Sequence, residues 1–203
     1  MTERLSILNL GTVLLRPQAA FRAIGERPPS GPAVFFGFAL WLGLLPPLFA
    51  YIGTTTFGWR LGVEPLYLPA ATVLAISIAY FALLLFGFLS AAFVAHWMAT
   101  TYGADPAFGR SLALIALVGA PLSIGSVVHL CPHAFINVLV LVPLLIWSMY
   151  LLYRGLPIVL KTDPGRGMLM ASSLIAYLLI AWVSLLGITV VLWSRGIGPR
   201  IVT

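Results

Sequence analysis

The chain has 203 residues, of which 61% are hydrophobic and 8% are charged, against roughly 25% charged residues in an ordinary soluble domain. A soluble fold of this length needs more charge to keep its surface solvated, so the composition excludes a soluble enzyme and a disordered chain. A single cysteine also excludes a disulfide scaffold. The remaining class is an all-α polytopic membrane protein, since the apolar runs lack the alternation of a transmembrane β-barrel.

Residues 1–30 are predicted to form an amphipathic segment on the cytoplasmic membrane surface. Apolar residues recur every three to four positions in its first half, and Pro17 then suits the first turn of a second short helix. In that helix Phe21 belongs to an apolar edge, while Arg16 and Arg22 can reach lipid head groups. We expect these three side chains to contact the membrane surface or a partner, unless the segment is only a tether.

Four long stretches without a charged residue predict the membrane spans. They hold 32, 40, 43 and 28 residues, and lie between Arg27 and Arg60, Glu64 and Asp105, Arg110 and Arg154, and Arg166 and Arg195. A spanning helix needs about 20 apolar residues, because the hydrocarbon core is about 30 Å thick. The third stretch can hold two spans joined by a hairpin at Pro132. We therefore predict a transmembrane domain over residues 31–195, an outer tail at 196–203, and five helices at about 33–52, 69–99, 111–130, 134–153 and 168–193.

The basic residues orient these spans. If the N-terminus is cytoplasmic, the inner segments carry eight of the 11 Lys and Arg residues and the outer segments carry three. Five spans then place the C-terminus on the other side of the membrane. The net charge of +6 is expected to face anionic lipid head groups at the cytoplasmic surface, and it shows no clustered basic face of the kind that binds nucleic acid.

No predicted span contains Asp, Glu, Lys or Arg. Pumps and ion-coupled transporters normally hold such a group inside the membrane, because it performs the coupling, so its absence disfavours both classes. The candidate polar residues inside the spans are His96 and Asn137. A channel or transporter for a small solute, without an intramembrane carboxylate, remains the alternative function, and prolines inside three spans favour it.

A metal-ligand pattern occurs on the predicted outer hairpin. His129, Cys131 and His133 carry imidazole and thiolate groups, which are good ligands for zinc or copper. The spacing of two residues and the stiff Pro132 fit a metal site poorly, so a polar hairpin cap is the favoured interpretation. Catalytic motifs are missing from the sequence as well. We therefore predict no cofactor, no metal and no enzymatic activity.

The segment from Arg154 to Arg166 is predicted to be a cytoplasmic loop between the last two spans. Its basic residues Arg154, Lys161 and Arg166 alternate with apolar ones, so the loop can contact head groups or a protein partner. Stripes of small residues in the second and third spans favour close packing of helices, and they would also allow homo-oligomerisation.

Several short motifs follow one another in an order typical of a known family. They are Pro17-x-x-x-Phe21-x-x-Ile24, residues 51–55, Gly103 with Phe108, Ala120-Pro121, and residues 147–157. In this order the chain resembles the bacterial branch of the Yip family, five-span membrane proteins related to the Rab-GTPase-interacting proteins of the eukaryotic secretory pathway. The resemblance implies a helical bundle in the bacterial inner membrane, a cytoplasmic N-terminus, a periplasmic C-terminus and no catalytic or cofactor residues.

Binding of Rab-type GTPases does not carry over with this resemblance, because the N-terminal region here is short and basic. We therefore predict a non-catalytic membrane protein of the Yip type. It would act in membrane organisation through lipid or through a protein partner of unidentified kind.

Overall fold

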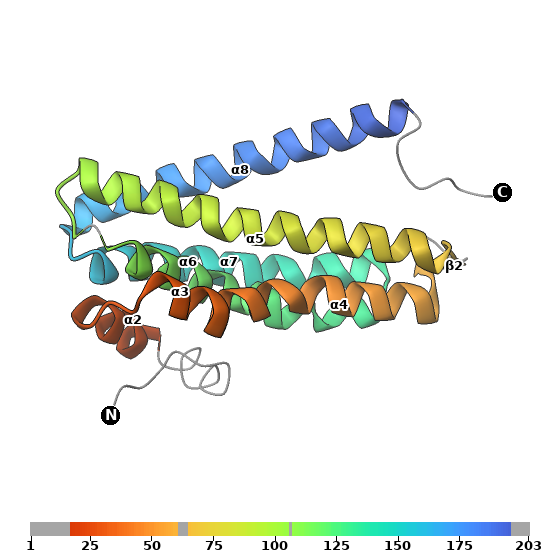
Figure 1. Ribbon diagram of the computed structural model, residues 1–203, viewed down its shortest axis with the longest axis horizontal. Coiled ribbons are helices and arrows are strands. Elements are labelled where there is room, and N and C mark those ends of the chain that lie inside the picture. The colour runs from red at the N-terminus through yellow and green to blue at the C-terminus, as the bar shows by residue number, and fades with distance from the viewer. Residues whose placement is uncertain (1–16, 61–64, 106, 196–203) are drawn as a thin grey trace.

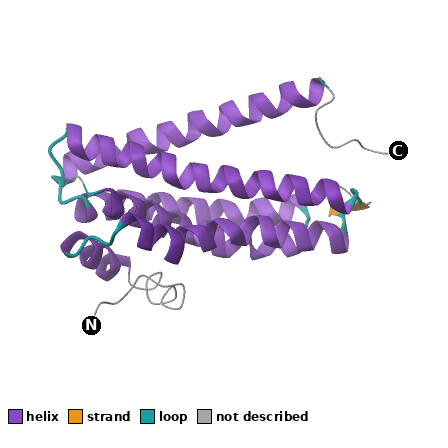
Figure 2. Ribbon diagram, viewed as in Figure 1, coloured by secondary structure: helices purple, strands orange, loops and turns teal. Residues whose placement is uncertain are grey.

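A computed structural model describes residues 17–60, 65–105 and 107–195. Its architecture is a bundle of long helices that lie along the long axis of the molecule, with a single short pair of strands among these residues (Figures 1 and 2). Five helical segments are long and apolar enough to cross a membrane. The predicted class, an all-α polytopic membrane protein with five spans, is confirmed.

A short helix, α2 (Pro17–Glu26), precedes the first span. That span is built from α3 (Gly31–Val34), the π-helix η2 (Phe35–Ala39) and α4 (Leu40–Phe57). The strands β1 (Trp59–Arg60) and β2 (Pro65–Leu66) follow, and they pair antiparallel with Trp59 opposite Leu66. The remaining spans are α5 (Ala70–Thr101), α6 (Phe108–Gly125) with the 3-10 helix η3 (Ser126–Leu130), α7 (Ala134–Val159) and α8 (Pro164–Ser194).

The central helix of the bundle is α6, which packs against α4, α5 and α7. Its buried side chains include Leu112, Leu114 and Leu117. By contrast, α8 packs through Met170, Ala171 and Leu174 near its start and then diverges from the other helices (Figure 1). The rest of α8 exposes apolar side chains, as expected of a helix that faces lipid.

Only part of the predicted small-residue stripe on α5 packs in the core. Ala91, Ala95 and Ala99 are buried, while Ala75 and Ala79 are exposed. The stripe therefore serves close packing where α5 crosses α6, and its first half faces outward.

The end of α7 differs from the prediction. The helix continues to Val159 instead of ending near residue 153, although Pro157 lies within it. Gly155, Leu156 and Val159 are buried, so packing against neighbouring helices holds these extra turns in place. The predicted loop over residues 154–166 is therefore wrong for most of its length.

The true connection between α7 and α8 is short and well capped. It covers residues 160–163, and the carboxylate of Asp163 accepts hydrogen bonds from the backbone N–H groups of Gly165 and Arg166. These donors belong to the first turn of α8, which Pro164 begins. Asp163 therefore acts as the N-terminal cap of the last span.

Candidate functional site

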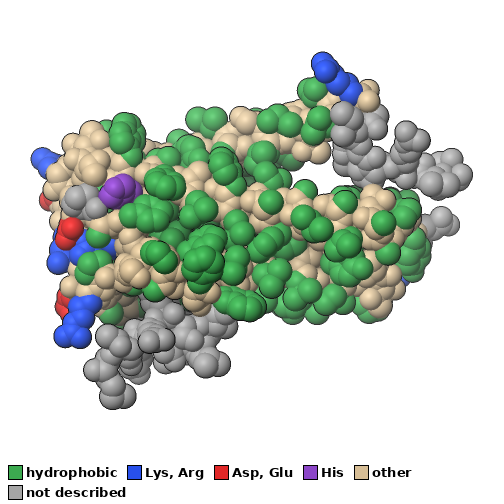
Figure 3. Space-filling view, in the orientation of Figure 1, with side chains coloured by type: hydrophobic (Ala, Val, Ile, Leu, Met, Phe, Trp, Pro, Cys, Tyr) green, Lys and Arg blue, Asp and Glu red, His purple; other side chains and the backbone are tan. Residues whose placement is uncertain are grey.

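Charged side chains gather at one end of the bundle, which we call the basic end (Figure 3). It is formed by α2 and by the two loops that connect α5 to α6 and α7 to α8. The described charged residues here are Arg22, Glu26, Arg27, Asp105, Arg110, Arg154, Lys161, Asp163 and Arg166. At the other end, which we call the opposite end, the described charged residues are Arg60 and Arg195.

Helix α2 docks on the bundle at the basic end. Phe21 and Ile24 are buried, and a Cβ atom on Gly155 would lie 2.7 Å from the Phe21 ring. Likewise, a Cβ atom on Gly25 would lie 2.9 Å from the carbonyl oxygen of Ile158. Two glycines therefore let α2 approach α7 closely. The predicted contact of Phe21 with the membrane surface or a partner is therefore wrong. The ring packs inside the protein, because Gly155 leaves a recess for it.

Arg110 of α6 holds the end of α2 in this position. Its side chain is 2% exposed, and Nη2 donates a hydrogen bond of 3.0 Å to the carbonyl oxygen of Gly25. Carbonyl groups in the last turn of a helix carry partial negative charge and favour a cation nearby. Nη1 forms an ion pair with the carboxylate of Asp105, which precedes α6. The buried cation thus joins the end of α2 to the loop between α5 and α6.

Arg110 also changes the acidity of its partner. The hydrogen-bonding contact with Arg110, and then the charges of Arg110 and Lys161, hold the pKa of Asp105 below its usual value. Asp105 is therefore ionised over the whole physiological range of pH. Since its carboxylate is still 45% exposed, solvent screens this ion pair in part.

Hydrogen bonds to backbone carbonyl oxygens join the remaining segments of the basic end. The N–H of Asp105 donates to the carbonyl oxygen of Leu160 at 3.1 Å, and Nη1 of Arg166 donates to that of Tyr102 at 3.3 Å. Arg166, a predicted contact residue, therefore caps the C-terminal end of α5. Lys161, another predicted contact residue, is exposed in the loop between α7 and α8. The two loops form one connected surface beside α2.

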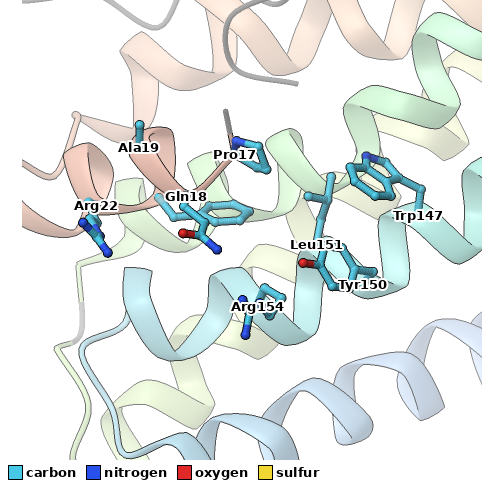
Figure 4. A pocket seen from close by; sticks show the side chains of 9 residues that line it. Pro17, Gln18, Ala19, Arg22, Trp147, Tyr150, Leu151 and Arg154 are labelled. Carbon is cyan, nitrogen blue, oxygen red and sulfur yellow. The ribbon is translucent and has the colours of Figure 1, made fainter. Parts of the chain in front are cut away.

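A groove of about 490 Å³ opens between α2 and α7 (Figure 4). Its lining includes two of the predicted contact residues, Arg22 from α2 and Arg154 from α7. On α7 the rings of Trp147 and Tyr150 stack with their centroids 5.3 Å apart, and the Arg154 guanidinium lies 6.0 Å from the centre of the Tyr150 ring. The structure thus brings together residues far apart in the sequence, while the predicted contact residue Arg16 lies outside the described residues.

Asn137 organises the hairpin at the opposite end. Its side chain contacts the ring of His129 and donates hydrogen bonds to the carbonyl oxygens of Cys131, at 3.0 Å, and His133, at 2.9 Å. The neighbouring Pro132 carbonyl accepts a hydrogen bond from the backbone N–H of Arg60. Asn137 is therefore a capping residue and not a group in the middle of the bundle.

The residues of the metal-ligand pattern lie in this same hairpin. His129 contacts Asn137, and Cys131 is an exposed free thiol. Within residues 17–60, 65–105 and 107–195, no three His, Cys, Asp or Glu side chains lie close enough together to hold a metal ion. The His129 ring and the carbonyl oxygens of Cys131 and His133 instead take part in hydrogen bonding within the hairpin.

The two candidate polar residues of the spans lie at different ends. His96 is half-buried near the basic end, where its ring meets that of Phe108 edge to face with the centroids 5.9 Å apart.

A second hollow, of about 320 Å³, lies at the opposite end beside Arg60 and His133. It shares no lining residue with the groove between α2 and α7. The two hollows therefore lie at separate ends of the bundle.

The structure adds Arg110, Gly25 and Gly155 to the residues that build the site. In the sequence, Arg110 counts only as a charge at the end of a span. Its proximity to Asp105 and its place directly before an apolar run are signals for a buried ion pair, but neither identifies α2 as the second partner.

Comparison with known proteins identifies the family to which this bundle belongs. The model of the Yip1 domain matches residues 11–185, which include α2, the groove and Arg110. The chain belongs to the Yip family. Two similar Yip-family relatives are described as inner membrane protein YohC, from Escherichia coli K12 and from Escherichia coli O6:H1 strain CFT073. Each is 32% identical over 158 residues, which cover 77% of this chain and 81% of the relative. No solved structure matches significantly.

Proposed function

We propose that this protein is a non-catalytic integral protein of the bacterial inner membrane, and that its basic end is an interaction surface facing the cytoplasm. The observation that carries the proposal is the docked helix α2, which forms a groove with α7 at the end where charged residues gather. The surface would act in membrane organisation by binding lipid or a protein partner.

The orientation is supported by the basic residues. Six of those described, Arg22, Arg27, Arg110, Arg154, Lys161 and Arg166, lie at the basic end, against Arg60 and Arg195 at the opposite end. Basic residues are retained on the cytoplasmic side of inner membranes. The description of the two relatives as inner membrane proteins supports the location in that membrane, whereas the orientation rests on the basic residues alone.

The non-catalytic role is supported by what two of the described carboxylates do. Asp105 forms the ion pair with Arg110, and Asp163 caps α8. Each thus has a structural task. General acid–base catalysis instead needs such groups to face a substrate.

Photocrosslinking in native membranes tests the interaction surface. A benzoylphenylalanine residue replacing Gln18, which is exposed on the groove wall, should give reproducible adducts with a lipid or a protein. The same residue in place of Arg195 at the opposite end is the control and should not give those adducts. No adduct at position 18, or the same adducts at both positions, would overturn the proposal.

Thiol labelling tests the orientation separately. Cys131, the single cysteine of the chain, is exposed at the opposite end, so a membrane-impermeant maleimide should reach it only from the periplasm. In the Cys131→Ser background, Arg27→Cys at the basic end should react only in inverted membranes. The reverse pattern would contradict a cytoplasmic basic end.

A further inference from the structure

Two arginine side chains line the groove between α2 and α7, and neither forms an ion pair with an acidic side chain of the described residues. Arg22 and Arg154 are both exposed and line the same groove, while the ion pair found among the described residues joins Arg110 to Asp105. Two guanidinium groups attract an anion with several acceptor oxygens, and their planar donor geometry suits phosphate. Gln18, on the same wall, offers a further amide donor.

The Arg154 side chain is already directed by its surroundings. Its guanidinium lies 6.0 Å from the centre of the Tyr150 ring, within the range of a cation–π contact. Tyr150 in turn stacks on Trp147. These three side chains form a row along α7. Because they are ordered before a ligand arrives, binding costs less side-chain conformational entropy.

The groove changes from polar to apolar along α7. In Figure 4 the Trp147 indole lies at the far end of the row from Arg22. Arg154 is seven positions after Trp147, which is about 10 Å along a helix. Trp147 lies about halfway along α7 (Ala134–Val159), so its ring is placed to contact acyl chains, and Tyr150 lies between it and Arg154, where Tyr favours the boundary with the head groups. Beyond Tyr150 an exposed apolar stripe continues along α7, formed by Ile146, Val142 and Leu139.

An anionic phospholipid is complementary to both parts of this surface, the charged part at the two arginines and the apolar stripe on α7. Its phosphate would satisfy the two arginines, and its acyl chains would lie on the apolar stripe of α7. A free phosphate ion would use only the charged half. An acidic peptide would leave the exposed stripe without a partner suited to the membrane interior.

We propose that the groove between α2 and α7 binds the head group of one anionic phospholipid of the cytoplasmic leaflet, with its phosphate between Arg22 and Arg154. The lipid inserts its acyl chains past Trp147 along α7. This inference rests on the proposed function, which places the basic end at the cytoplasmic face, and it names the ligand of that surface.

Native mass spectrometry of the full chain in detergent tests this site. The protein is titrated with phosphatidylglycerol and with phosphatidylcholine of the same acyl chains. The first bound phosphatidylglycerol should bind about tenfold more tightly, because the choline group masks the negative charge. The double variant Arg22→Gln, Arg154→Gln should lose this preference. Arg22→Lys with Arg154→Lys should keep part of it, which shows that the loss does not come from misfolding.

A matched control removes the same charge elsewhere. Arg60→Gln with Arg195→Gln acts at the opposite end and should leave the preference unchanged. Equal binding of the two lipids to the wild-type chain would overturn the inference. So would a preference that survives in the groove variant or that is lost equally in the control. Competition by millimolar inorganic phosphate would identify a site for the free ion in place of a lipid.

The crosslinking experiment separates this inference from the proposed function. Protein adducts at position 18, together with equal binding of the two lipids, would overturn the lipid site and leave the interaction surface standing. Failure of crosslinking at position 18 to both lipid and protein would overturn both.

Discussion

The two ends of the bundle are closed by different chemistry. At the basic end a buried cation, Arg110, joins α6 to the last turn of α2. At the opposite end a neutral amide, Asn137, joins the carbonyl groups of the hairpin. Both ends need glycine for close approach, since Gly155 admits the Phe21 ring and Gly53 lies against the His129 carbonyl. Among the described residues, a buried charge therefore closes the basic end, and a neutral amide closes the opposite end.

The largest effect should come from filling the recess under Phe21. In Gly155→Val the new side chain would overlap the ring, so α2 must leave the bundle or α7 must shift. We expect the free energy of unfolding in detergent to fall by about 3 kcal/mol. Titration with a denaturing detergent measures it.

Gly187→Val provides the matched control for this change. Gly187 lies on the divergent part of α8, where an added Cβ atom would meet no other atom within 4 Å, so the same substitution should cost little. Equal losses at positions 155 and 187 would show that α2 does not dock through Phe21.

Removing the buried cation should have the next largest effect. Arg110→Met leaves the Gly25 carbonyl and the Asp105 carboxylate without their partner. We expect a loss of about 2 kcal/mol in the free energy of unfolding, less than for a fully buried pair because Asp105 reaches solvent. Arg195→Met, at the exposed end of α8, is the control. An unchanged stability in Arg110→Met would refute the role of Arg110 in holding α2.

A smaller effect is expected at the opposite end. Asn137→Leu removes two hydrogen bonds to the Cys131 and His133 carbonyls and should cost about 1 kcal/mol, since Cys131 is exposed and water can replace part of the bonding. The orientation of α2 should not change. Maleimide labelling of Cys131 should become faster as the hairpin loosens, and an unchanged rate would argue against the capping role.

The smallest effect concerns pH. The pKa of Asp105 is lowered in the folded protein, so its ion pair stabilises the fold above the ordinary carboxyl pKa of 3.8 and this contribution is lost as the pH falls through the lowered value. Unfolding measured from pH 6 downward should show a loss of stability that is weaker in Asp105→Asn. An identical pH profile in the variant would exclude the ion pair as its source.

The sequence predicts the number and approximate position of the membrane spans well. Charges cannot lie in the hydrocarbon core without cost, so the four charge-free stretches, with the third divided by a hairpin at Pro132, give the five spans. Pro17 predicts a helix over the residues that follow it, because its fixed backbone suits a first turn, and α2 covers those residues. These signals are local, and local signals can be read without knowing the tertiary structure.

Features that depend on packing between distant segments are harder to predict. Pro157 suggests the end of a helix, but buried contacts of Leu156 and Val159 extend α7 past it. The apolar edge of α2 suggests contact with lipid, and only the recess at Gly155 shows that Phe21 packs in the protein. Similarly, Arg22 and Arg154 are recognisable as surface cations, but their place in one groove depends on how α2 docks.

The docking of α2 is tested most directly by the environment of the Phe21 ring. 4-Fluorophenylalanine at position 21 is nearly isosteric, and fluorine NMR can measure its broadening by a doxyl-labelled lipid and by a water-soluble gadolinium complex. The same label at Phe86, which is 66% exposed on α5, is the reference for lipid contact. We predict that doxyl lipid broadens the signal at position 86 and that neither reagent broadens the signal at position 21. Broadening at position 21 by doxyl lipid as strong as at position 86 would contradict a docked α2.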